Sequence, residues 1–274
     1  MKEQLFFLVQ DSADHLESRN IAREYLQALV LKCLQRSGAM VLLAFKGGTA
    51  LRFLHNSRRY SHDLDFALQG GLANFEFPKF LRAIQSDLHD QGYKPEVKVS
   101  DAEPIKEAFV SFPGLLYELQ LSPDPGDALS VRIEINTDPP PGAGLQITLI
   151  RKYVLLRLFH YDRATLFAEK ISEILGRVDL KGRDMYDLVW YLCDPAWPAP
   201  NLALLNNALG PGGWKGTPVR PDTWVSVLEE HLASVFWENV VEDVRPYLEG
   251  GDDILPLLNR ETLKRLLERV AGSF

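Results

Sequence analysis

The sequence predicts an α+β protein, in which a core with a mixed or antiparallel sheet spans residues 1–150 and a mainly helical region spans residues 151–274. Short runs of alternating apolar residues follow one another closely between residues 93 and 136, and closely spaced strands favour antiparallel pairing. Before and after that stretch, apolar residues recur instead at helical spacing. The 274 residues are 46% hydrophobic and 24% charged, which is ordinary for a globular protein with a sizeable core.

Each element follows from periodicity and from the residues that interrupt it. A helix over 20–36 has its apolar residues at helical spacing and ends at Ser37-Gly38. The stretch 41–56 has the order strand, glycine turn and helix, and the strand after it runs to about Leu68. The elements expected beyond that strand are a helix at 75–91 and strands at 93–99, 107–112, 116–121, 129–136 and 145–149.

The proline-rich stretch Asp138–Gly142 is the stiffest break in the chain, and the change to helices is expected soon after it, near Arg151. Two apolar stripes then indicate helices, and a last helix is expected at 261–270. The members of the stripes are Phe167, Ile171, Ile174, Leu175 and Val178, then Met185, Leu188, Val189 and Leu192.

Composition and charge restrict the classes of protein. Two cysteines make no disulfide framework or zinc signature, so a reducing cytoplasm is expected. No apolar run approaches the length of a membrane span, so no membrane partner is expected. A net charge of −7 argues against an extended nucleic-acid-binding surface. However, residues 151–183 hold eight basic residues against four acidic ones, which indicates either a solvated helix with internal ion pairs or a basic wall that binds triphosphate or RNA.

The glycine turn at residues 46–49 has the features of a phosphate-binding loop. Gly47 and Gly48 let backbone N–H groups approach an anion closely, and the helix that follows points its positive end at that anion. We therefore expect Gly47, Gly48 and Thr49 to bind the β- and γ-phosphates of a nucleoside triphosphate (NTP). Lys46 has two interpretations, because it could reach a phosphate or simply be solvated at a strand end.

Two aspartates on the next strand suggest a metal site. Asp63 and Asp65 share one face of a strand, roughly 7 Å apart at Cα, and can share divalent cations. Ser61 has the same parity, so it either touches nucleotide or bonds its own backbone. Glu134 lies on the polar face of the strand at 129–136 and would complete a three-carboxylate site if the two strands are neighbours; otherwise it belongs to an ordinary solvent face. A phosphate cradle followed by paired carboxylates suggests metal-assisted nucleotidyl transfer.

The order of these motifs resembles the nucleotidyltransferase superfamily and, more narrowly, the AbiEii/AbiGii toxin family. The motifs are Gly-Gly-Thr at 47–49, Arg-Tyr-Ser-His-Asp-Leu-Asp-Phe at 59–66, Arg-Ile-Glu-Ile at 132–135, and Glu169-Lys170 followed by Arg183–Leu188. The resemblance implies a nucleotidyltransferase-like core, and a role for Lys170, Asp184 and Asp187 near the nucleotide. Asp184 could instead be an acidic residue that the dipole favours at a helix N-terminus.

Together, the motifs and the resemblance predict a cytoplasmic nucleotidyltransferase that moves a nucleoside monophosphate from an NTP to a macromolecular acceptor. Asp63, Asp65 and Glu134 are expected to hold Mg²⁺ in a two-metal site, with Glu134 also taking the acceptor's proton. The resemblance implies a bacterial toxin with an antitoxin partner, and tRNA as the leading acceptor. The alternatives are nucleotidylation of a protein hydroxyl, which an acidic chain would suit, and a non-catalytic nucleotide-binding protein.

Overall fold

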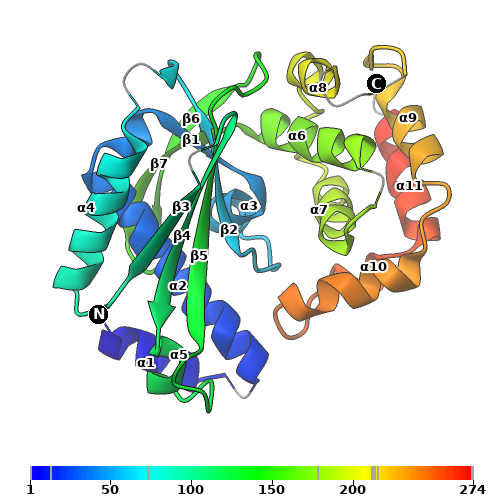
Figure 1. Cartoon of the computed structure of the whole chain (residues 1–274). Helices are drawn as coiled ribbons and strands as arrows, with labels where there is room; N and C mark the ends of the chain where they lie inside the picture. Colours follow the sequence, from blue (N-terminus) through cyan, green and yellow to red (C-terminus); the bar gives the residue numbers. More distant parts are fainter. Residues whose placement is uncertain are drawn as a thin grey trace. The chain divides into compact units, whose positions relative to one another are not determined.

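The computed structural model describes residues 2–12, 14–72, 75–100, 102–177, 179–210, 214 and 216–272. It divides into two compact units, of which one comprises Met1–Pro139 and Gln146–His160, and the other comprises Pro140–Leu145 and Tyr161–Phe274. The first unit contains the sheet, and the second is built of helices (Figure 1). The expected boundary at 150/151 therefore falls at the end of a strand of the sheet.

The sheet is mixed and seven-stranded, with the order β3-β4-β5-β2-β1-β7-β6. Its strands are β1 (Leu43–Lys46), β2 (Asp63–Leu68), β3 (Glu96–Ser100), β4 (Ile105–Pro113), β5 (Ala128–Asn136), β6 (Leu145–Arg151) and β7 (Leu155–Tyr161). β3, β4 and β5 pair antiparallel, as their close spacing predicts, and β1 pairs antiparallel with β2. The pairs β2–β5 and β1–β7 are parallel. The α+β class with a mixed sheet is confirmed.

Helices cover the apolar face of this sheet (Figure 1). They are α1 (Lys2–Gln10), α2 (His15–Arg36), α3 (Gly47–His55), α4 (Phe77–Asp90) and the short α5 (Leu115–Glu118), with a 3-10 turn η1 at Ala39–Val41. α2 contacts β5 and α4, and α3 contacts β1 and β2. Leu64, Phe66, Ile133 and Ile135 are fully buried on the covered face, where each contributes roughly 1.5–3 kcal/mol. The side chains that alternate with these residues along the strands point to the opposite, polar face of the sheet.

Two expectations about the sheet are wrong. Residues 116–121 do not form a strand, because Gly114 takes a left-handed backbone conformation (φ +72°) and starts the helical turn α5, which buries Leu115 and Leu116. A short apolar run fits a strand or a helical turn equally well by periodicity. The change to helices also comes later than Arg151, because β7 adds a further strand whose His160 is paired with Phe45 of β1.

The second unit is helical from Arg163 onward in its described residues. Its elements are α6 (Arg163–Gly176), α7 (Gly182–Cys193), α8 (Leu202–Leu209), α9 (Trp224–His231), α10 (Trp237–Val244), the 3-10 turns η3 (Arg245–Tyr247) and η4 (Leu255–Leu257), and α11 (Arg260–Ala271). The predicted stripes are buried in α6 and α7, apart from Val178, which lies outside the described residues. Side chains of Asp162, Asn201 and Asn259 cap α6, α8 and α11 by accepting backbone N–H bonds. None of the helices described is long and apolar enough to cross a membrane.

Candidate active site

The glycine turn joins β1 directly to α3. Gly47 has φ +73°, and a Cβ there would lie 2.4 Å from Oδ2 of Asp65. A Cβ on Gly48 would lie 2.4 Å from Nη2 of Arg59 and 2.9 Å from Oγ of Ser61. Gly47 therefore requires glycine for its left-handed backbone conformation, while a side chain at Gly48 would require Arg59 and Ser61 to shift. The turn brings the N-terminus of α3, with its first N–H groups lacking partners within the helix, against the carboxylate of Asp65.

Strand register places the three predicted carboxylates on one face. β2 pairs parallel with β5 so that Asp65 is opposite Glu134 and Asp63 is opposite Arg132. Adjacent strands lie about 4.8 Å apart, so the sheet brings these side chains together. Antiparallel pairing adds Lys46 of β1 opposite Asp65 and Glu107 of β4 opposite Glu134. The condition that the two strands be neighbours is met, and the four strands form a row of one cation and three carboxylates.

Arg132 provides a second cation on this face. Its Nη2 donates to Glu107 Oε1 and forms an ion pair with Glu134 Oε2 at 2.7 Å, while its Nη1 lies 3.5 Å from Asp63 Oδ2. Burial acts to lower the pKa of Arg132, but the bond to Glu107 and the charges of Glu134 and Asp63 raise that pKa overall. Alternation along β5 predicts that Arg132 and Glu134 share a face. The contacts of Arg132 with three carboxylates could not be predicted from the sequence, because they depend on which strands pair with β5.

The residues of this cluster fit a divalent ion by chemistry but not with the side chains as they stand. In the described part of the chain, no group of three or more His, Cys, Asp or Glu side chains is placed to hold a metal ion. The guanidinium of Arg132 bridges Asp63 and Glu134, where an ion would otherwise take their oxygens. Three carboxylates are nevertheless the hard oxygen ligands that Mg²⁺ prefers. The assignment of Asp63, Asp65 and Glu134 as metal ligands stays a prediction.

Thr49 and Ser61 both take part in the scaffold around the turn. The Thr49 hydroxyl donates to the backbone oxygen of Asp63, which ties the start of α3 to the start of β2. The carbonyl of Ser61, just before β2, accepts a bond of 3.0 Å from Gln27 Nε2, and its Oγ lies against Gly48. These contacts fix the turn relative to the aspartate strand. The binding of phosphate by Thr49 and Ser61 stays a prediction.

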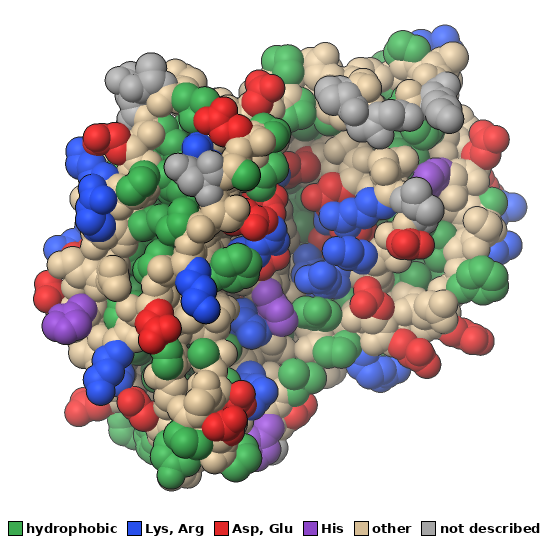
Figure 2. Space-filling model, viewed as in Figure 1, with side chains coloured by type: hydrophobic (Ala, Val, Ile, Leu, Met, Phe, Trp, Pro, Cys, Tyr) green, Lys and Arg blue, Asp and Glu red, His purple; other side chains and the backbone are tan. Residues whose placement is uncertain are grey.

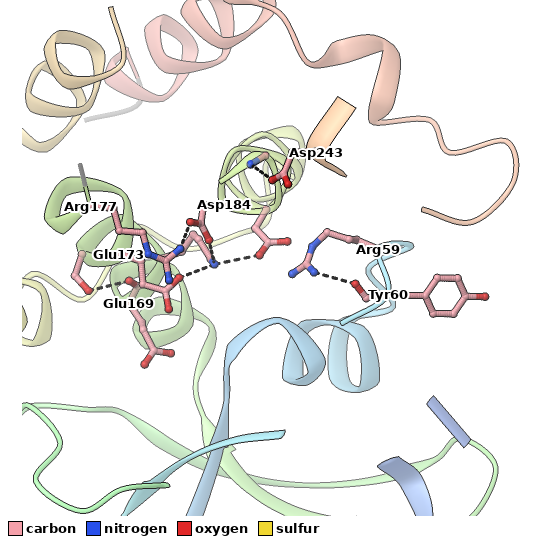
Figure 3. Close-up of polar contacts among 11 residues, drawn as sticks. Arg59, Tyr60, Glu169, Glu173, Arg177, Asp184 and Asp243 are labelled. Atoms are coloured by element: carbon pink, nitrogen blue, oxygen red, sulfur yellow. Dashed lines mark hydrogen bonds and ion pairs between the residues drawn. The ribbon is translucent and has the colours of Figure 1, made fainter. Parts of the chain in front are cut away.

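A buried ion cluster anchors the other end of α3. Glu24 of α2 pairs with Arg52 of α3 and, at 3.2 Å, with Lys152, and it accepts a bond of 2.6 Å from the Tyr153 hydroxyl. Burial acts to raise the pKa of Glu24, but the two cations lower that pKa overall. Arg52 also donates to the carbonyl of Ser57 at 3.0 Å, which holds the loop that leads to the aspartate strand. The same loop carries the buried Arg59, which donates to the carbonyl of Tyr60 at 2.9 Å (Figure 3).

The three residues to which the family resemblance gives a role, Lys170, Asp184 and Asp187, lie close together in the second unit. Lys170 of α6 lies 2.9 Å from Asp184 and 3.2 Å from Asp187, both on α7, and 2.7 Å from Glu173 on its own helix. Arg177 also pairs with Asp184, as Figure 3 shows. Burial acts to raise the pKa of Asp184, but Lys170 and Arg177 lower that pKa overall. The cluster is therefore an ordered, charged network rather than a set of separate side chains.

The start of α7 is held by its neighbours within the second unit. The backbone N–H of Gly182 donates to Oδ2 of Asp243 at 2.6 Å (Figure 3). A Cβ on Gly182 would lie 2.3 Å from the carbonyl oxygen of Val240 in α10, so glycine permits this close approach. Asp184 lies in the first turn of α7, where the helix dipole favours an acidic side chain, and it also has two cationic partners. Its place in the first turn fits the interpretation as an acidic residue that the helix dipole favours, and its role near the nucleotide stays a prediction.

Several basic side chains of the stretch 151–183 already contact other residues of the chain, so the stretch offers fewer cations to a ligand than its composition suggests. Ion pairs engage Lys152, Lys170 and Arg177, while Arg163 and Arg183 lie 4.9 Å and 4.6 Å from the rings of Trp197 and Tyr247. The exposed members are Arg151, Arg157, Arg163 and Lys181. In the view of Figure 2, basic and acidic side chains are interspersed over the sheet unit. Internal ion pairing therefore accounts for part of the stretch, and a basic wall that binds triphosphate or RNA stays a prediction.

The glycine turn gives a testable prediction about stability. Gly47→Ala should lower the free energy of unfolding by about 2–4 kcal/mol, because it adds a collision with Asp65 to a left-handed backbone penalty of about 1–2 kcal/mol. Gly38→Ala is the matched control, since Gly38 has φ +83° and no atom lies within 4 Å of a Cβ there. Denaturant unfolding of both variants measures the difference. Equal losses would show that Asp65 does not lie against the turn.

The fold and the site define a nucleotidyltransferase: a strand–glycine turn–helix, followed by paired aspartates on the next strand and a third carboxylate on its neighbour. The sequence matches the family described as nucleotidyl transferase AbiEii toxin, type IV toxin–antitoxin system, over residues 29–235. The chain belongs to this family. Among curated proteins, no sequence matches it.

Solved structures share the fold. MenT4, a nucleotidyltransferase toxin from Mycobacterium tuberculosis, is 16% identical with a TM-score of 0.55, covering 98% of this chain and 99% of that chain. JHP933 from Helicobacter pylori is 15% identical with a TM-score of 0.54, covering 93% of this chain and 92% of that chain. A putative nucleotidyltransferase from H. pylori, also 15% identical, has a TM-score of 0.53 and covers 92% of this chain and 94% of that chain. At these identities the likeness establishes the fold.

Proposed function

We propose that this toxin transfers a nucleoside monophosphate from an NTP to tRNA, using Mg²⁺ held by Asp63, Asp65 and Glu134 in a two-metal site. The observation that carries the proposal is the register of β2 and β5, which puts the three carboxylates on one face beside the glycine turn. Membership of a nucleotidyltransferase family supports an NTP as the donor, and membership of a toxin–antitoxin family supports an antitoxin as the partner.

The chain's own groups have distinct tasks in this reaction. The N–H groups at the start of α3 bind the β- and γ-phosphates, and Lys46 adds a positive charge beside Asp65. The acceptor hydroxyl attacks the α-phosphorus while the bond from that phosphorus to the bridging oxygen breaks, so that pyrophosphate leaves. Glu134 takes the proton of the attacking hydroxyl. Divalent ions held by Asp63, Asp65 and Glu134 would neutralise the triphosphate and orient it for in-line attack.

Roles toward the nucleotide are also proposed for Lys170, Asp184 and Asp187, and separately for Ser61. The support is their place in the motifs that resemble the family, together with the network that keeps Lys170 next to two carboxylates. A cytoplasmic location fits two free cysteines and a tRNA acceptor. Incubation with each labelled NTP and total RNA or lysate tests the acceptor. Label on protein would favour the protein-hydroxyl alternative, and no label in either fraction would favour a non-catalytic protein.

Salt dependence gives a sharper prediction for tRNA. If Arg151 and Arg157 contact phosphates, Arg151→Glu and Arg157→Glu should each reduce the slope of log affinity against log salt by about 1, through lost counterion release. Arg177 is unsuited to such a test because it pairs with Asp184. Arg82→Glu makes the same charge change at an exposed site on α4 and serves as the control. Identical slopes for all three variants would remove these arginines from the RNA-binding surface.

A further inference from the structure

We propose that Arg132 is a built-in counter-cation of the metal site, which holds the carboxylates together without metal and moves onto Glu107 alone when a divalent ion binds. This inference rests on the proposed function, because it takes Asp63 and Glu134 to be metal ligands. Arg132 is then a positioning residue that sets how strongly the site binds metal. It is not a catalytic residue, since it touches the ligands and not the reacting atoms.

The contacts of Arg132 carry the proposal. One guanidinium touches carboxylates on three adjacent strands, with Asp63 on β2, Glu134 on β5 and Glu107 on β4. Without a cation, carboxylates that face each other across neighbouring strands repel one another. Glu134 meets this repulsion on both sides, because its register partners are Asp65 and Glu107. Arg132 therefore supplies the positive charge that the cluster needs when no ion is bound.

Arg132 and a metal ion cannot both hold the same oxygens. The guanidinium uses Oε2 of Glu134 and lies against Oδ2 of Asp63, which are two of the three proposed ligands. A divalent ion that binds there must displace it. The four side chains involved are each about a third exposed, so the arginine has room to turn. Competition of this kind lowers the affinity of the site for free metal, and metal that arrives with a triphosphate gains further oxygen ligands.

Glu107 gives the displaced guanidinium a place to go. It lies on β4, on the far side of Glu134 from the aspartate strand, and it already accepts a bond from Arg132 Nη2. A turn toward Glu107 moves the positive charge away from Asp63 while keeping a charge-assisted bond. Glu107 is outside the proposed ligand set, so the arginine and the ion can then be bound at the same time on one face of the sheet.

The test is the binding of Mn²⁺ to the full chain without nucleotide, followed by electron paramagnetic resonance. Arg132→Gln should bind Mn²⁺ about tenfold more tightly than the wild type, because the ion no longer has to break a few partly exposed ion pairs in order to bind. Arg132→Lys keeps the charge but cannot bridge three carboxylates, so its affinity should lie between the two. Glu107→Gln should bind about threefold more weakly, because Arg132 loses its alternative partner. Lys98→Gln is the control, since Lys98 follows Phe109 and Arg132 in the same row of the sheet.

The outcomes separate this inference from the proposed function. If Lys98→Gln tightens binding as much as Arg132→Gln does, the effect is general electrostatics and the inference is overturned. Unchanged or weaker binding by Arg132→Gln overturns it as well, while the metal site stands if Asp63→Asn abolishes binding. If Asp63→Asn binds Mn²⁺ like the wild type, the metal site fails and the inference falls with it. Thermal unfolding supplies a second measurement: Arg132→Gln should melt below the wild type in chelator and recover with Mn²⁺.

Discussion

Asp63→Asn and Asp65→Asn are each expected to lower the rate of nucleotidyl transfer by about a thousandfold or more. A metal site supplies several kcal/mol of stabilisation to the charge that develops on the triphosphate, and every 1.4 kcal/mol is worth about a factor of ten. An amide keeps the shape of the carboxylate but removes the negative charge that a divalent cation requires. The measurement is the transfer of label from NTP to tRNA over a titration of Mg²⁺. A rate that stays low at saturating Mg²⁺ indicates lost chemistry, and a rate that recovers indicates weakened metal binding.

Stability distinguishes a functional role for these aspartates from a structural one. Asp63 is about a third exposed, and its ion pair with Arg132 at 3.5 Å is of a kind worth about 0–1 kcal/mol. The free energy of unfolding in chelator should therefore change by less than about 1 kcal/mol in Asp63→Asn. Asp90→Asn makes the same chemical change at the exposed end of α4 and should alter neither quantity. Turnover within tenfold of the wild type in either site variant would exclude that residue from the metal site.

Periodicity was enough to predict which side chains share a face, because a strand's period of two depends on local geometry alone. It placed Asp63 with Asp65, and Arg132 with Glu134 on the opposite face from Ile133. It could not predict that β2 and β5 are neighbours, since β3 and β4 lie between them in the sequence and pairing is a long-range property. The resemblance to a known family covered that gap, and the register of Asp65 with Glu134 confirms the adjacency.

The features that sequence reasoning missed all depend on tertiary contacts. Residues 116–121 have apolar spacing that suits a strand, but Gly114 and burial of Leu115 select a helical turn. β7 was missed because its partner β1 lies far away in the chain. Glu107 and Glu24 look like ordinary acidic residues in sequence, and their significance appears only through Arg132 and Arg52. A count of charges likewise could not predict that Arg177 forms an ion pair with Asp184.

Lys170→Ala should lower the free energy of unfolding by about 3 kcal/mol, because it removes a cation that two buried carboxylates share, while Arg177 stays paired with Asp184. Asp187 has no exposed surface and Asp184 has 4%, so each carboxylate loses an ion-pair partner at a position that bulk water does not reach. A loss of this size corresponds to a fall in melting temperature of about 10 °C. Lys264→Ala is the control, because Lys264 is an exposed helical lysine whose nearest carboxylate is 3.9 Å away, and it should cost less than about 1 kcal/mol.

The same variant should show a characteristic dependence on pH. The folded-state pKa of Asp184 lies below its ordinary value because Lys170 and Arg177 favour the carboxylate, which outweighs the opposing effect of burial. A depressed carboxyl pKa contributes stability that is fully present above the unfolded pKa, near pH 4, and is lost as pH falls through the folded pKa. The difference in unfolding free energy between wild type and Lys170→Ala should therefore be largest near neutral pH and shrink below about pH 4. A difference that stays constant from pH 7 to pH 3 in urea unfolding would show that Lys170 stabilises the chain by packing rather than by pairing with these carboxylates.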